Sequence, residues 1–187
     1  MSESKETLEI QNVVASTELS QELKLEQLAD DLPTTEYRPE SFPGLIFRTQ
    51  SPKAATLIFR SGKAVCTGAK SVRDVNKALE VVFNELQTLG ITIESSREVQ
   101  IQNIVSSGDL DHRLNLNAIA IGIGLKNIEY EPEQFPGLVY RLETPDVVIL
   151  LFGSGKAVVT GATSIGEAEL AFETVESELQ ELDLINK

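Results

Sequence analysis

The sequence contains two copies of one pattern. The segment EYRPESFPGLIFR around Phe42 returns as EYEPEQFPGLVYR around Phe135, and LIFRSGKAVCTGAKS returns as LLFGSGKAVVTGATS, both at an offset of 93 residues (135 − 42). Upstream, IQNVVAS from Ile10 returns as IQNIVSS from Ile101 at an offset of 91, so the second copy carries two extra residues between these blocks (93 − 91). A period this long indicates a duplicated domain, because solenoid periods lie nearer about 20–50 residues. Such a chain is pseudo-twofold and suits a partner that is itself nearly twofold symmetric, as duplex DNA is.

The composition is that of a globular protein. It is 41% hydrophobic and 24% charged, which is ordinary for a soluble domain. The start, MSESKETLE, lacks the apolar core of a signal peptide, and the longest apolar runs are too short to cross a bilayer. One cysteine, Cys66, excludes an internal disulfide and fits a reducing compartment. We therefore expect an intracellular protein, cytoplasmic or associated with the nucleoid, without a signal peptide or transmembrane segment and without a membrane partner.

The charge is unevenly distributed. A net charge of −13 argues against nucleic acid, because phosphate binding needs Lys and Arg. Yet residues 41–73 contain no Asp or Glu and hold Arg48, Lys53, Arg60, Lys63, Lys70 and Arg73. The acids gather elsewhere, notably over residues 167–183, as on the solvated face of a helix. This distribution permits nucleic-acid binding without requiring it.

Each copy predicts the same order of elements. A strand at residues 9–17 and again at 99–107 precedes a short helix that begins near Leu23 and Leu114. Loops at residues 39–44 and 132–137 are followed by three short strands. A long helix then closes each copy, with capping boxes at Ser71 and Ser164 and a stop at Gly90. A further strand is expected at residues 91–95. Apolar residues spaced three or four apart predict the buried helix faces: Val72, Val75, Leu79, Val82, Phe83 and Leu86 in the first copy, and Ile165, Ala168, Phe172, Val175, Leu179 and Leu182 in the second.

The strands are apolar on both sides. Successive side chains alternate between the faces of a strand, so we expect Val13, Ile58, Ala64 and Cys66 opposite Val14, Leu57, Phe59, Val65 and Thr67. The second copy repeats this, with Ile104, Leu151, Ala157 and Val159 opposite Val105, Leu150, Phe152, Val158 and Thr160. The predicted helices are too few to cover both faces of an antiparallel sheet. One apolar face stays exposed, which is typical of a binding surface.

Together, the doubled QN[VI]V, FPG, [LI]xFxSGK and TGA motifs resemble the TATA-box-binding protein family of archaeal and eukaryotic transcription initiation, in an archaeal-type form. The resemblance runs from about Leu8 to Leu184. It implies an α+β fold, a pseudo-twofold saddle of two β-α-β-β-β-β-α-type repeats whose curved antiparallel sheet carries helices on its convex face. The expected domains are a polar tail at residues 1–7, a first repeat at 8–97 and a second at 98–187.

The resemblance also implies how DNA is bound. Apolar wedges that unstack base steps bend DNA from the minor groove, and the TATA-box-binding proteins are themselves a standard example of this strategy. The wedges correspond to Phe42, Phe59, Phe135 and Phe152, with 17 residues between the members of each pair (59 − 42 and 152 − 135). The base contacts correspond to Asn12, Asn103, Val14, Val105, Val65, Val158, Thr67, Thr160, Leu57 and Leu150. Amide donors beside small apolar groups accept A·T pairs and conflict with the amino group of guanine. The other interpretation of each Phe is a core residue.

Phosphate and protein contacts follow from the same resemblance. The phosphate-contacting rim corresponds to Arg48, Lys63, Ser61, Arg141, Lys156 and Ser154. The partner contacts, to transcription factor B, correspond to Glu131, Glu133 and Gln134, which otherwise form only a solvated loop; RNA polymerase and its pre-initiation complex are implied as well. The chain departs from the family pattern at Ser41, Gln134 and Asp146, where basic residues are common, and Gly153 stands where the first copy has Arg60. Phosphate contact is therefore expected to be thinner in the second copy. A salt-rich cytoplasm, where charge contacts are screened, would account for the acidity.

Two other classes of function were weighed. A saddle-fold interaction module would bind a protein or an apolar ligand on the exposed sheet face, but paired amides at its centre do not suit a generic apolar groove. An enzyme is disfavoured because His112 and Cys66 are the only histidine and cysteine, which leaves no metal cluster. Cys66 falls on the helix-facing side, and the GIG at residues 122–124 reads as a helix end. We expect no catalytic residue, no metal, no cofactor and no small-molecule substrate.

Overall fold

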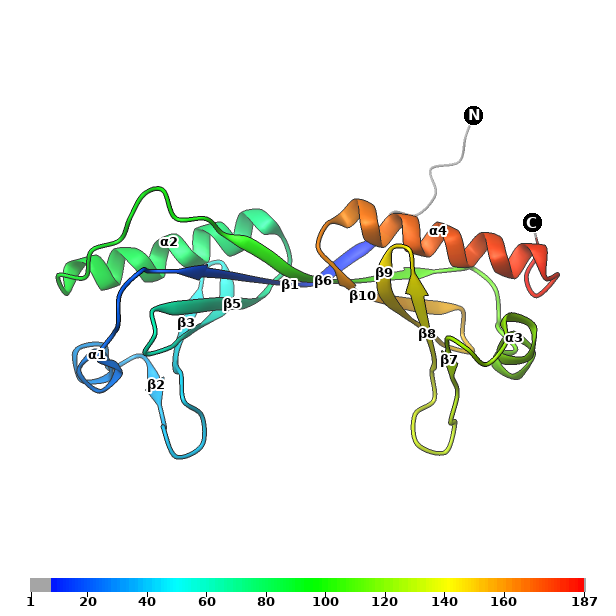
Figure 1. Cartoon of the computed structure of the whole chain (residues 1–187), viewed down its shortest axis with the longest axis horizontal. Helices are drawn as coiled ribbons and strands as arrows, with labels where there is room; N and C mark the ends of the chain where they lie inside the picture. Colours follow the sequence, from blue (N-terminus) through cyan, green and yellow to red (C-terminus); the bar gives the residue numbers. More distant parts are fainter. Residues whose placement is uncertain (1–7, 187) are drawn as a thin grey trace. The chain divides into compact units, whose positions relative to one another are not determined.

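The structure of the chain, a computed structural model, describes residues 8–186, so the expected tail at residues 1–7 lies outside the described part. Those residues form two compact units (Figure 1). The N-terminal unit is residues 12–102, and the C-terminal unit combines residues 8–11 with residues 103–186. Each unit therefore covers most of one predicted repeat and takes a few residues from the first strand of the other.

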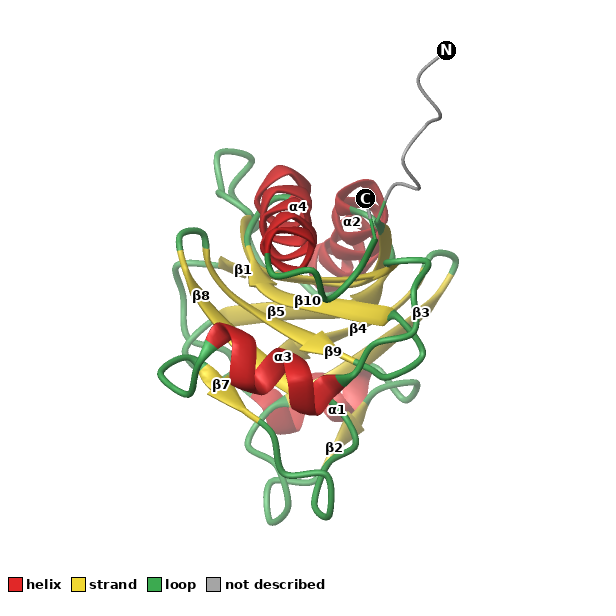
Figure 2. Cartoon of the chain, turned by 90° about the vertical axis from the view of Figure 1, so that its right-hand side faces the viewer, coloured by secondary structure: helices red, strands yellow, loops and turns green. Residues whose placement is uncertain are grey.

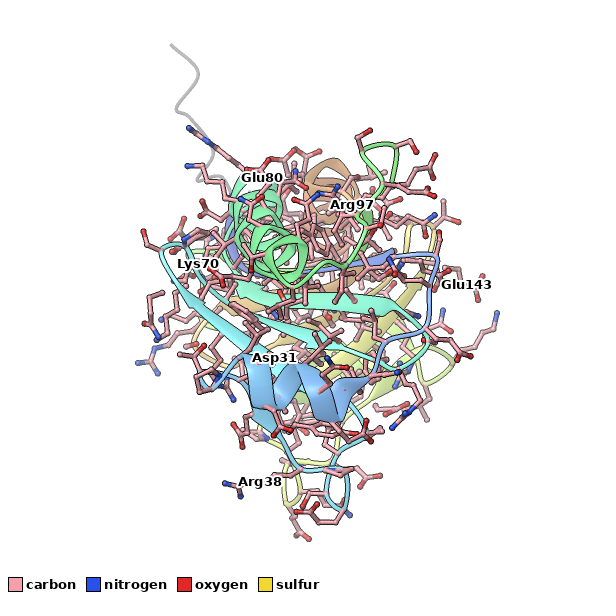
Figure 3. The ribbon with its side chains drawn as sticks, turned by 90° about the vertical axis from the view of Figure 1, so that its left-hand side faces the viewer. Asp31, Arg38, Lys70, Glu80, Arg97 and Glu143 are labelled. Carbon is pink, nitrogen blue, oxygen red and sulfur yellow. The ribbon has the colours of Figure 1, made fainter. Side chains whose placement is uncertain are left out.

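The N-terminal unit is a five-stranded antiparallel sheet with two helices. Its strands lie in the order β2-β3-β4-β5-β1. Along the chain its elements are β1 (Glu9–Glu18), α1 (Leu25–Asp31), β2 (Glu36–Tyr37), β3 (Leu45–Gln50), β4 (Lys53–Ile58), β5 (Lys63–Ala69) and α2 (Val72–Thr88). The helix α2 packs on β3, β4 and β5. Figure 3 shows Glu80 on α2 and Arg38 in the loop after β2, at opposite ends of this unit.

The C-terminal unit repeats this arrangement. Its strands lie in the order β6-β10-β9-β8-β7 and pair antiparallel. Its elements are β6 (Gln100–Asp109), α3 (Leu116–Ile123), β7 (Ile128–Glu129), β8 (Leu138–Glu143), β9 (Asp146–Leu151), β10 (Lys156–Ala162) and α4 (Ile165–Glu181). Figure 2 shows α4 along one side of the sheet and α3 near the strand β7. The expected α+β class and the two matching antiparallel repeats are thus confirmed within each unit.

The ends of the long helices follow their sequence signals. The hydroxyl of Ser71 accepts a hydrogen bond from the N–H of Asp74 at 3.0 Å, and the hydroxyl of Ser164 accepts one from the N–H of Glu167 at 3.2 Å. Gly90 follows the last turn of α2 with φ +84°, a left-handed conformation that favours glycine. The serine N-caps of both helices and the glycine stop are therefore confirmed.

Some expectations about the helices and strands were wrong. Val72 is 40% exposed and Leu182 is 42% exposed, because they lie at the first residue of α2 and the C-cap of α4, where the helix face extends past the core. Residues 91–95 form no strand. The N–H of Ile91 instead donates to the Leu86 carbonyl at the end of α2, and the Arg97 guanidinium lies 4.2 Å from the ring centroid of Phe83. This segment therefore packs along a helix. The short strands β2 and β7 were not located from the sequence pattern, although the β-α-β-β-β-β-α order implied by the resemblance includes a strand at each of these places.

The two sides of each sheet differ in burial as the alternation predicts. In the N-terminal unit, Ile58, Ala64 and Cys66 are buried beneath the helices, and their neighbours Leu57 and Val65 are half-buried on the other side. We call this second side the open face of a unit. The open faces carry these half-buried aliphatic and threonine side chains: Val14, Ile46, Ala55, Leu57, Val65 and Thr67 in one unit, and Val105, Val139, Val148, Leu150, Val158 and Thr160 in the other.

Candidate nucleic-acid interface

The floor of each open face is a patch of small apolar side chains. Strand pairing sets Leu57 beside Val65 and Ala55 beside Thr67, and in the C-terminal unit it sets Leu150 beside Val158. Every floor residue named from the sequence lies on an open face. The structure adds two residues per unit that the sequence reasoning missed, Ile46 and Ala55 in the first and Val139 and Val148 in the second. The period-two pattern along β3, β4, β8 and β9 would have found them.

The amide of Asn12 is held by a bulge in the neighbouring strand. Its oxygen accepts a hydrogen bond from the backbone N–H of Gly68 at 2.7 Å, and its nitrogen lies 3.2 Å from the hydroxyl oxygen of Thr67. Gly68 has φ +91°, and the β1–β5 register shifts between Val13 and Ala15. Such a bulge with a left-handed glycine re-aims backbone groups out of the ladder. The amide is fixed with its oxygen occupied by the backbone, and its nitrogen has a second hydrogen to donate.

The C-terminal unit has the same arrangement at Asn103. The amide oxygen accepts from the N–H of Gly161 at 2.7 Å, and the nitrogen lies 3.2 Å from the hydroxyl oxygen of Thr160. Gly161 has φ +94°, and the β6–β10 register shifts between Val159 and Ala162. The glycine of the TGA motif therefore has a physical role in both copies. It supplies the N–H that orients the asparagine, a partner that the sequence alone did not identify.

The four candidate wedge phenylalanines form one ring pair in each unit. The ring centroids of Phe42 and Phe59 are 5.8 Å apart at an interplanar angle of 65°, an edge-to-face contact. Those of Phe135 and Phe152 are 5.9 Å apart at 71°. Phe42, Phe59 and Phe152 are half-buried and Phe135 is exposed, so these rings lie outside the buried core. The interpretation of the four phenylalanines as core residues is wrong.

The glycine of each FPG motif makes room for the rings. A Cβ at Gly44 would lie 2.7 Å from Cε1 of Phe42 and 3.1 Å from Cε1 of Phe59. At Gly137 the corresponding distances are 2.7 Å to Phe135 and 3.0 Å to Phe152. Real Cβ atoms do not approach other atoms this closely, so each ring pair rests directly on the backbone of its glycine.

The SGK motifs form the tight turns between β4 and β5 and between β9 and β10. The hydroxyl of Ser61 accepts from the N–H of Lys63, and that of Ser154 accepts from the N–H of Lys156, both at 3.4 Å. Both lysines are exposed. Each lies two residues before an open-face valine on the same strand, so the alternation of side chains places it on the same side of the sheet. Within residues 8–186, neither lysine forms an ion pair. Each turn therefore presents a free ammonium group at the edge of the open face.

The two candidate arginines are each beside a carboxylate. Arg48 Nη2 lies 3.8 Å from an oxygen of Glu36, and Arg141 Nε lies 3.3 Å from Oε1 of Glu129. Both acids come from the short strands that were not located from the sequence pattern, which is why the sequence did not suggest this pairing. Exposed pairs of this kind are worth little, about 0–1 kcal/mol. They nonetheless lower the positive charge that the arginines offer to a phosphate.

The loop between β7 and β8 presents the candidate partner residues. Glu131, Glu133 and Gln134 are all exposed. The Glu131 carbonyl accepts hydrogen bonds from the N–H groups of Gln134 and Phe135, at 2.9 and 3.0 Å, so one turn joins these residues to the wedge. In the N-terminal unit the same turn is built on the carbonyl of Arg38. The first copy thus has a basic residue in place of Glu131 but keeps an acid, Glu40, in place of Glu133.

Cys66 lies away from these surfaces. It is fully buried on the helix side of β5, as the alternation predicted, and burial raises the pKa of its thiol. A protonated, inaccessible thiol is a poor nucleophile. The other feature weighed for chemistry, the GIG segment, ends α3, with Gly124 at its C-cap and φ +92°. Cys66 and the GIG segment therefore both have structural roles.

Each open face combines the same four features: an amide donor, an apolar floor, a pair of aromatic rings and a lysine. Fixed amide nitrogens lie beside small apolar groups, a ring pair lies next to an FPG turn, and lysines border each face. Such a surface is suited to a groove that offers hydrogen-bond acceptors and little steric hindrance. None of the helices in residues 8–186 is both long and apolar enough to cross a membrane.

Comparisons with known proteins agree with this arrangement. The family model described as transcription factor TFIID (or TATA-binding protein, TBP) matches residues 7–89 and 98–182. TATA-box-binding protein B of Halobacterium salinarum is 61% identical over 186 residues, with 100% of both chains covered, and TATA-box-binding protein 2 of Haloferax volcanii is 59% identical over 185 residues, covering 99% of this chain and 100% of the relative. The solved structure of Methanococcus jannaschii TBP superposes with a TM-score of 0.85 at 46% identity, covering 94% of this chain and 99% of that one. The chain therefore belongs to the TATA-binding protein family, a family of transcription factors and not of enzymes.

Proposed function

We propose that this chain binds the minor groove of a TATA promoter element with its open faces, bends the DNA, and recruits transcription factor B and RNA polymerase. The observation that carries the proposal is the pair of backbone-locked amides, Asn12 and Asn103, each set in an apolar floor. The names of the relatives, all TATA-box-binding proteins, support the same conclusion.

Sequence preference follows from the amides and the floor. The minor groove of an A·T pair presents only acceptors, whereas a G·C pair adds the amino group of guanine. Each asparagine has a donor to offer, because its oxygen is turned toward the backbone N–H of Gly68 or Gly161 and its nitrogen keeps a hydrogen for a ligand. The valine side chains around it offer no acceptor to an amino group. A guanine at this position would leave its donor unpaired, so A·T pairs are favoured.

Bending follows from the ring pairs. An apolar side chain that enters between base pairs replaces part of the lost stacking, which costs a few kcal/mol per step. Each unit holds its two rings at the edge of the floor, supported from beneath by the glycine of FPG. TA-rich steps are the easiest to deform, which adds a second preference for A·T sequences. Phosphate contact is assigned to Lys63, Lys156, Arg48 and Arg141, assisted by Ser61 and Ser154.

Recruitment is assigned to the loop of the C-terminal unit. Glu131, Glu133 and Gln134 are exposed beside the wedge Phe135, so a partner bound to them would contact the protein next to the bent DNA. Acidic groups select a partner with a basic surface, and we assign that role to transcription factor B, through which RNA polymerase is brought to the promoter. A protein with these activities acts inside the cell, where the DNA lies.

The test is a binding titration with fluorescently labelled duplexes. One duplex carries a TATA element and the other carries G·C pairs at its central positions, and both are titrated over a series of salt concentrations. We expect tighter binding to the TATA duplex at every salt concentration, together with a change in end-to-end energy transfer that reports bending. Equal binding to both duplexes, without bending, would contradict the proposal and favour an interaction module that binds a protein or apolar ligand on the open face.

A further inference from the structure

The helix α3 presents an aliphatic surface that the DNA-binding proposal does not use. Ile121 and Leu125 are each 83% exposed, and Leu182, just past α4, is 42% exposed. The opposite side of α3 is anchored, because Leu116 and Ile119 are buried in the core of the C-terminal unit. We call Ile121, Leu125 and Leu182 the α3 patch. Contiguous exposed apolar surface of this kind marks sites of protein interaction.

One member of the α3 patch, Leu182, lines a pocket at the end of α3, and Ile121 and Leu125 are sequence neighbours of the pocket-lining residues Gly122 and Gly124. A Cβ at Gly122 would lie 3.5 Å from Cδ1 of Leu182 and 3.3 Å from Cδ1 of Leu184, so the end of α3 is against the residues that follow α4. The pocket, of about 360 Å³, opens beside them. Its walls include Gly122–Gly124, Lys126, Tyr140, Glu178, Glu181 and Leu182. Figure 2 shows α3 facing the viewer and α4 above it, on the other side of the strands.

The polar walls of this pocket are acidic. The Tyr140 hydroxyl donates a hydrogen bond to Glu178 at 2.8 Å, and burial together with that carboxylate raises the pKa of Tyr140 to about 12. Tyr140 is therefore a neutral donor that holds the Glu178 carboxylate in place. The one cation, Lys126, lies 3.4 Å from the carboxylate of Glu143. Glu178 and Glu181 thus determine the charge that the pocket offers.

The first copy of the repeat shows that the fold does not need an aliphatic residue at the position of Ile121. At the offset of 91 residues, Asp30 stands where Ile121 stands, and Asp31, on α1 in Figure 3, stands where Gly122 stands. Leu125 falls where the second copy gains its two extra residues. The same helix is therefore built in the N-terminal unit with acids on its outer side. The exposed aliphatic side chain of Ile121 in the second copy therefore calls for another reason, which a binding role supplies.

We propose that the α3 patch and its pocket bind a helical segment of a partner protein, with a Leu- or Ile-rich face flanked by Lys or Arg. The aliphatic face would cover Ile121, Leu125 and Leu182, and a basic side chain would enter the pocket toward Glu178 and Glu181. A second copy of this chain fits less well, because it would bring an identical acidic rim against this one, and like charges across an interface are costly. The surface is separate from the open-face residues, so the proposal does not depend on DNA binding.

The test uses two synthetic amphipathic peptides of about 14 residues, long enough to form helical turns on a surface. One alternates Leu and Lys at helical spacing, and the other replaces every Lys by Glu. Each is titrated into the full isotope-labelled chain and followed by two-dimensional NMR. We expect the Leu/Lys peptide to shift signals of α3, residues 124–127 and the end of α4 in a saturable manner, and the Leu/Glu peptide to shift none of them.

Two matched variants separate apolar binding from simple charge attraction. Ile121→Asp removes the patch while adding an acid, and Leu170→Asp makes the same change at another exposed position, 52% exposed on α4. If the patch binds, Ile121→Asp weakens the peptide by about tenfold or more, as expected for a lost aliphatic contact, and Leu170→Asp leaves it unchanged or tighter. Glu181→Lys weakens binding further than Glu173→Lys does.

Three outcomes would overturn the proposal. Signals shifted all over the acidic surface, or equal effects of Ile121→Asp and Leu170→Asp, would show non-specific charge attraction. Concentration-dependent dimerisation in sedimentation, abolished by Ile121→Asp, would assign the patch to a second copy instead. Unchanged binding of the TATA duplex by Ile121→Asp is the control that distinguishes this surface from the proposed DNA-binding faces.

Discussion

The side-chain oxygen of Asn12 accepts a hydrogen bond from the backbone N–H of Gly68 at 2.7 Å, across 56 residues of sequence. Asn103 and Gly161 repeat the contact at the same distance in the other unit. An isolated asparagine on a strand can flip its amide, exchanging donor and acceptor. Here the hydrogen bond from the backbone N–H fixes the orientation of the amide, so that its NH2 group can donate to a ligand.

Replacing the amide by its isostere tests this orientation. In Asn103→Asp the carboxylate keeps the hydrogen bond from Gly161 but has no hydrogen to donate, and it adds negative charge. We expect normal folding and a loss of TATA affinity of at least about 1–3 kcal/mol, the value of a good base contact. Binding titrations with central A·T and G·C duplexes measure the change. A uniform loss on every duplex would mean that the amide does not read bases.

The bulge glycine is expected to influence base preference through Asn12. An alanine at Gly68 has room, since its Cβ would lie 3.7 Å from the nearest atom, Cα of Ala54, but φ +91° strains it. Such strain costs about 1–2 kcal/mol and shifts the backbone. Gly90→Ala is the matched control, with φ +84° and open space. We expect similar losses in thermal stability from both variants and an altered A·T preference only from Gly68→Ala.

Removing one ring pair is expected to abolish bending and leave the fold intact. Phe135→Ala with Phe152→Ala deletes rings that lie outside the core. We expect the thermal transition to stay near that of the wild type, while the bend reported by energy transfer between labelled DNA ends is lost. Phe83→Ala provides the contrast, because that ring is 2% exposed and its loss costs about 3–5 kcal/mol of stability. Unfolding of the double variant would show that the two rings are core residues.

Releasing Arg141 from its carboxylate is expected to strengthen DNA binding. Glu129→Gln removes the negative charge that lies 3.3 Å from the arginine. We expect the binding free energy for DNA to become more favourable by about 0.2–1 kcal/mol, the usual value of an exposed pair. The plot of log affinity against log salt concentration is expected to become steeper by roughly the value of one phosphate contact. Glu173→Gln, which makes the same charge change on exposed α4 surface, is the control. Equal gains in DNA affinity from both variants would indicate that only the net charge of the protein matters, and not the release of Arg141.

The acidic loop is expected to act on the protein partner and spare the DNA. Reversing Glu131 and Glu133 to Arg adds like-charge repulsion against a basic partner, which costs several kcal/mol. Binary binding to a TATA duplex is expected to hold or strengthen. Gel shifts with transcription factor B, added at increasing concentration, measure the ternary complex. Its formation at the wild-type concentration would place the partner elsewhere.

The repeat made most of the fold predictable from sequence. Each motif occurred twice in the same order, so the strands, the helices, their caps and the buried and open sides of the sheet could be assigned by comparing copies. The strands β2 and β7 belong to the repeat order that the resemblance implied, but they could not be placed in the sequence because two residues are too few to show an alternating pattern. The strand expected at residues 91–95 had the right composition, but Arg97 and Ile91 tie that segment to α2 instead.

The candidate site was predictable as a set of residues and not as a set of contacts. The spacing of Phe42 and Phe59 suggested a pair, yet the role of Gly44 beneath them requires coordinates. The same holds for Asn12, whose partner depends on a register shift that no local pattern reveals. Arg48 was identified, while its carboxylate neighbour Glu36 was not, because the strand that carries Glu36 could not be placed in the sequence.

The division of β1 between the two units determines whether a fragment that contains only one copy can have a complete core. Leu8 belongs to the core of the C-terminal unit, and a Cβ at Gly108 would lie 2.7 Å from Cδ2 of Leu8, so the first described residues fill a space that the second copy leaves empty. A fragment that begins at the second copy would encode every motif of that copy and still lack part of its interior. The two copies are separate in sequence, but the core of the second copy is completed by a residue from the start of the first, so the first copy could not be removed whole without leaving a cavity in the second.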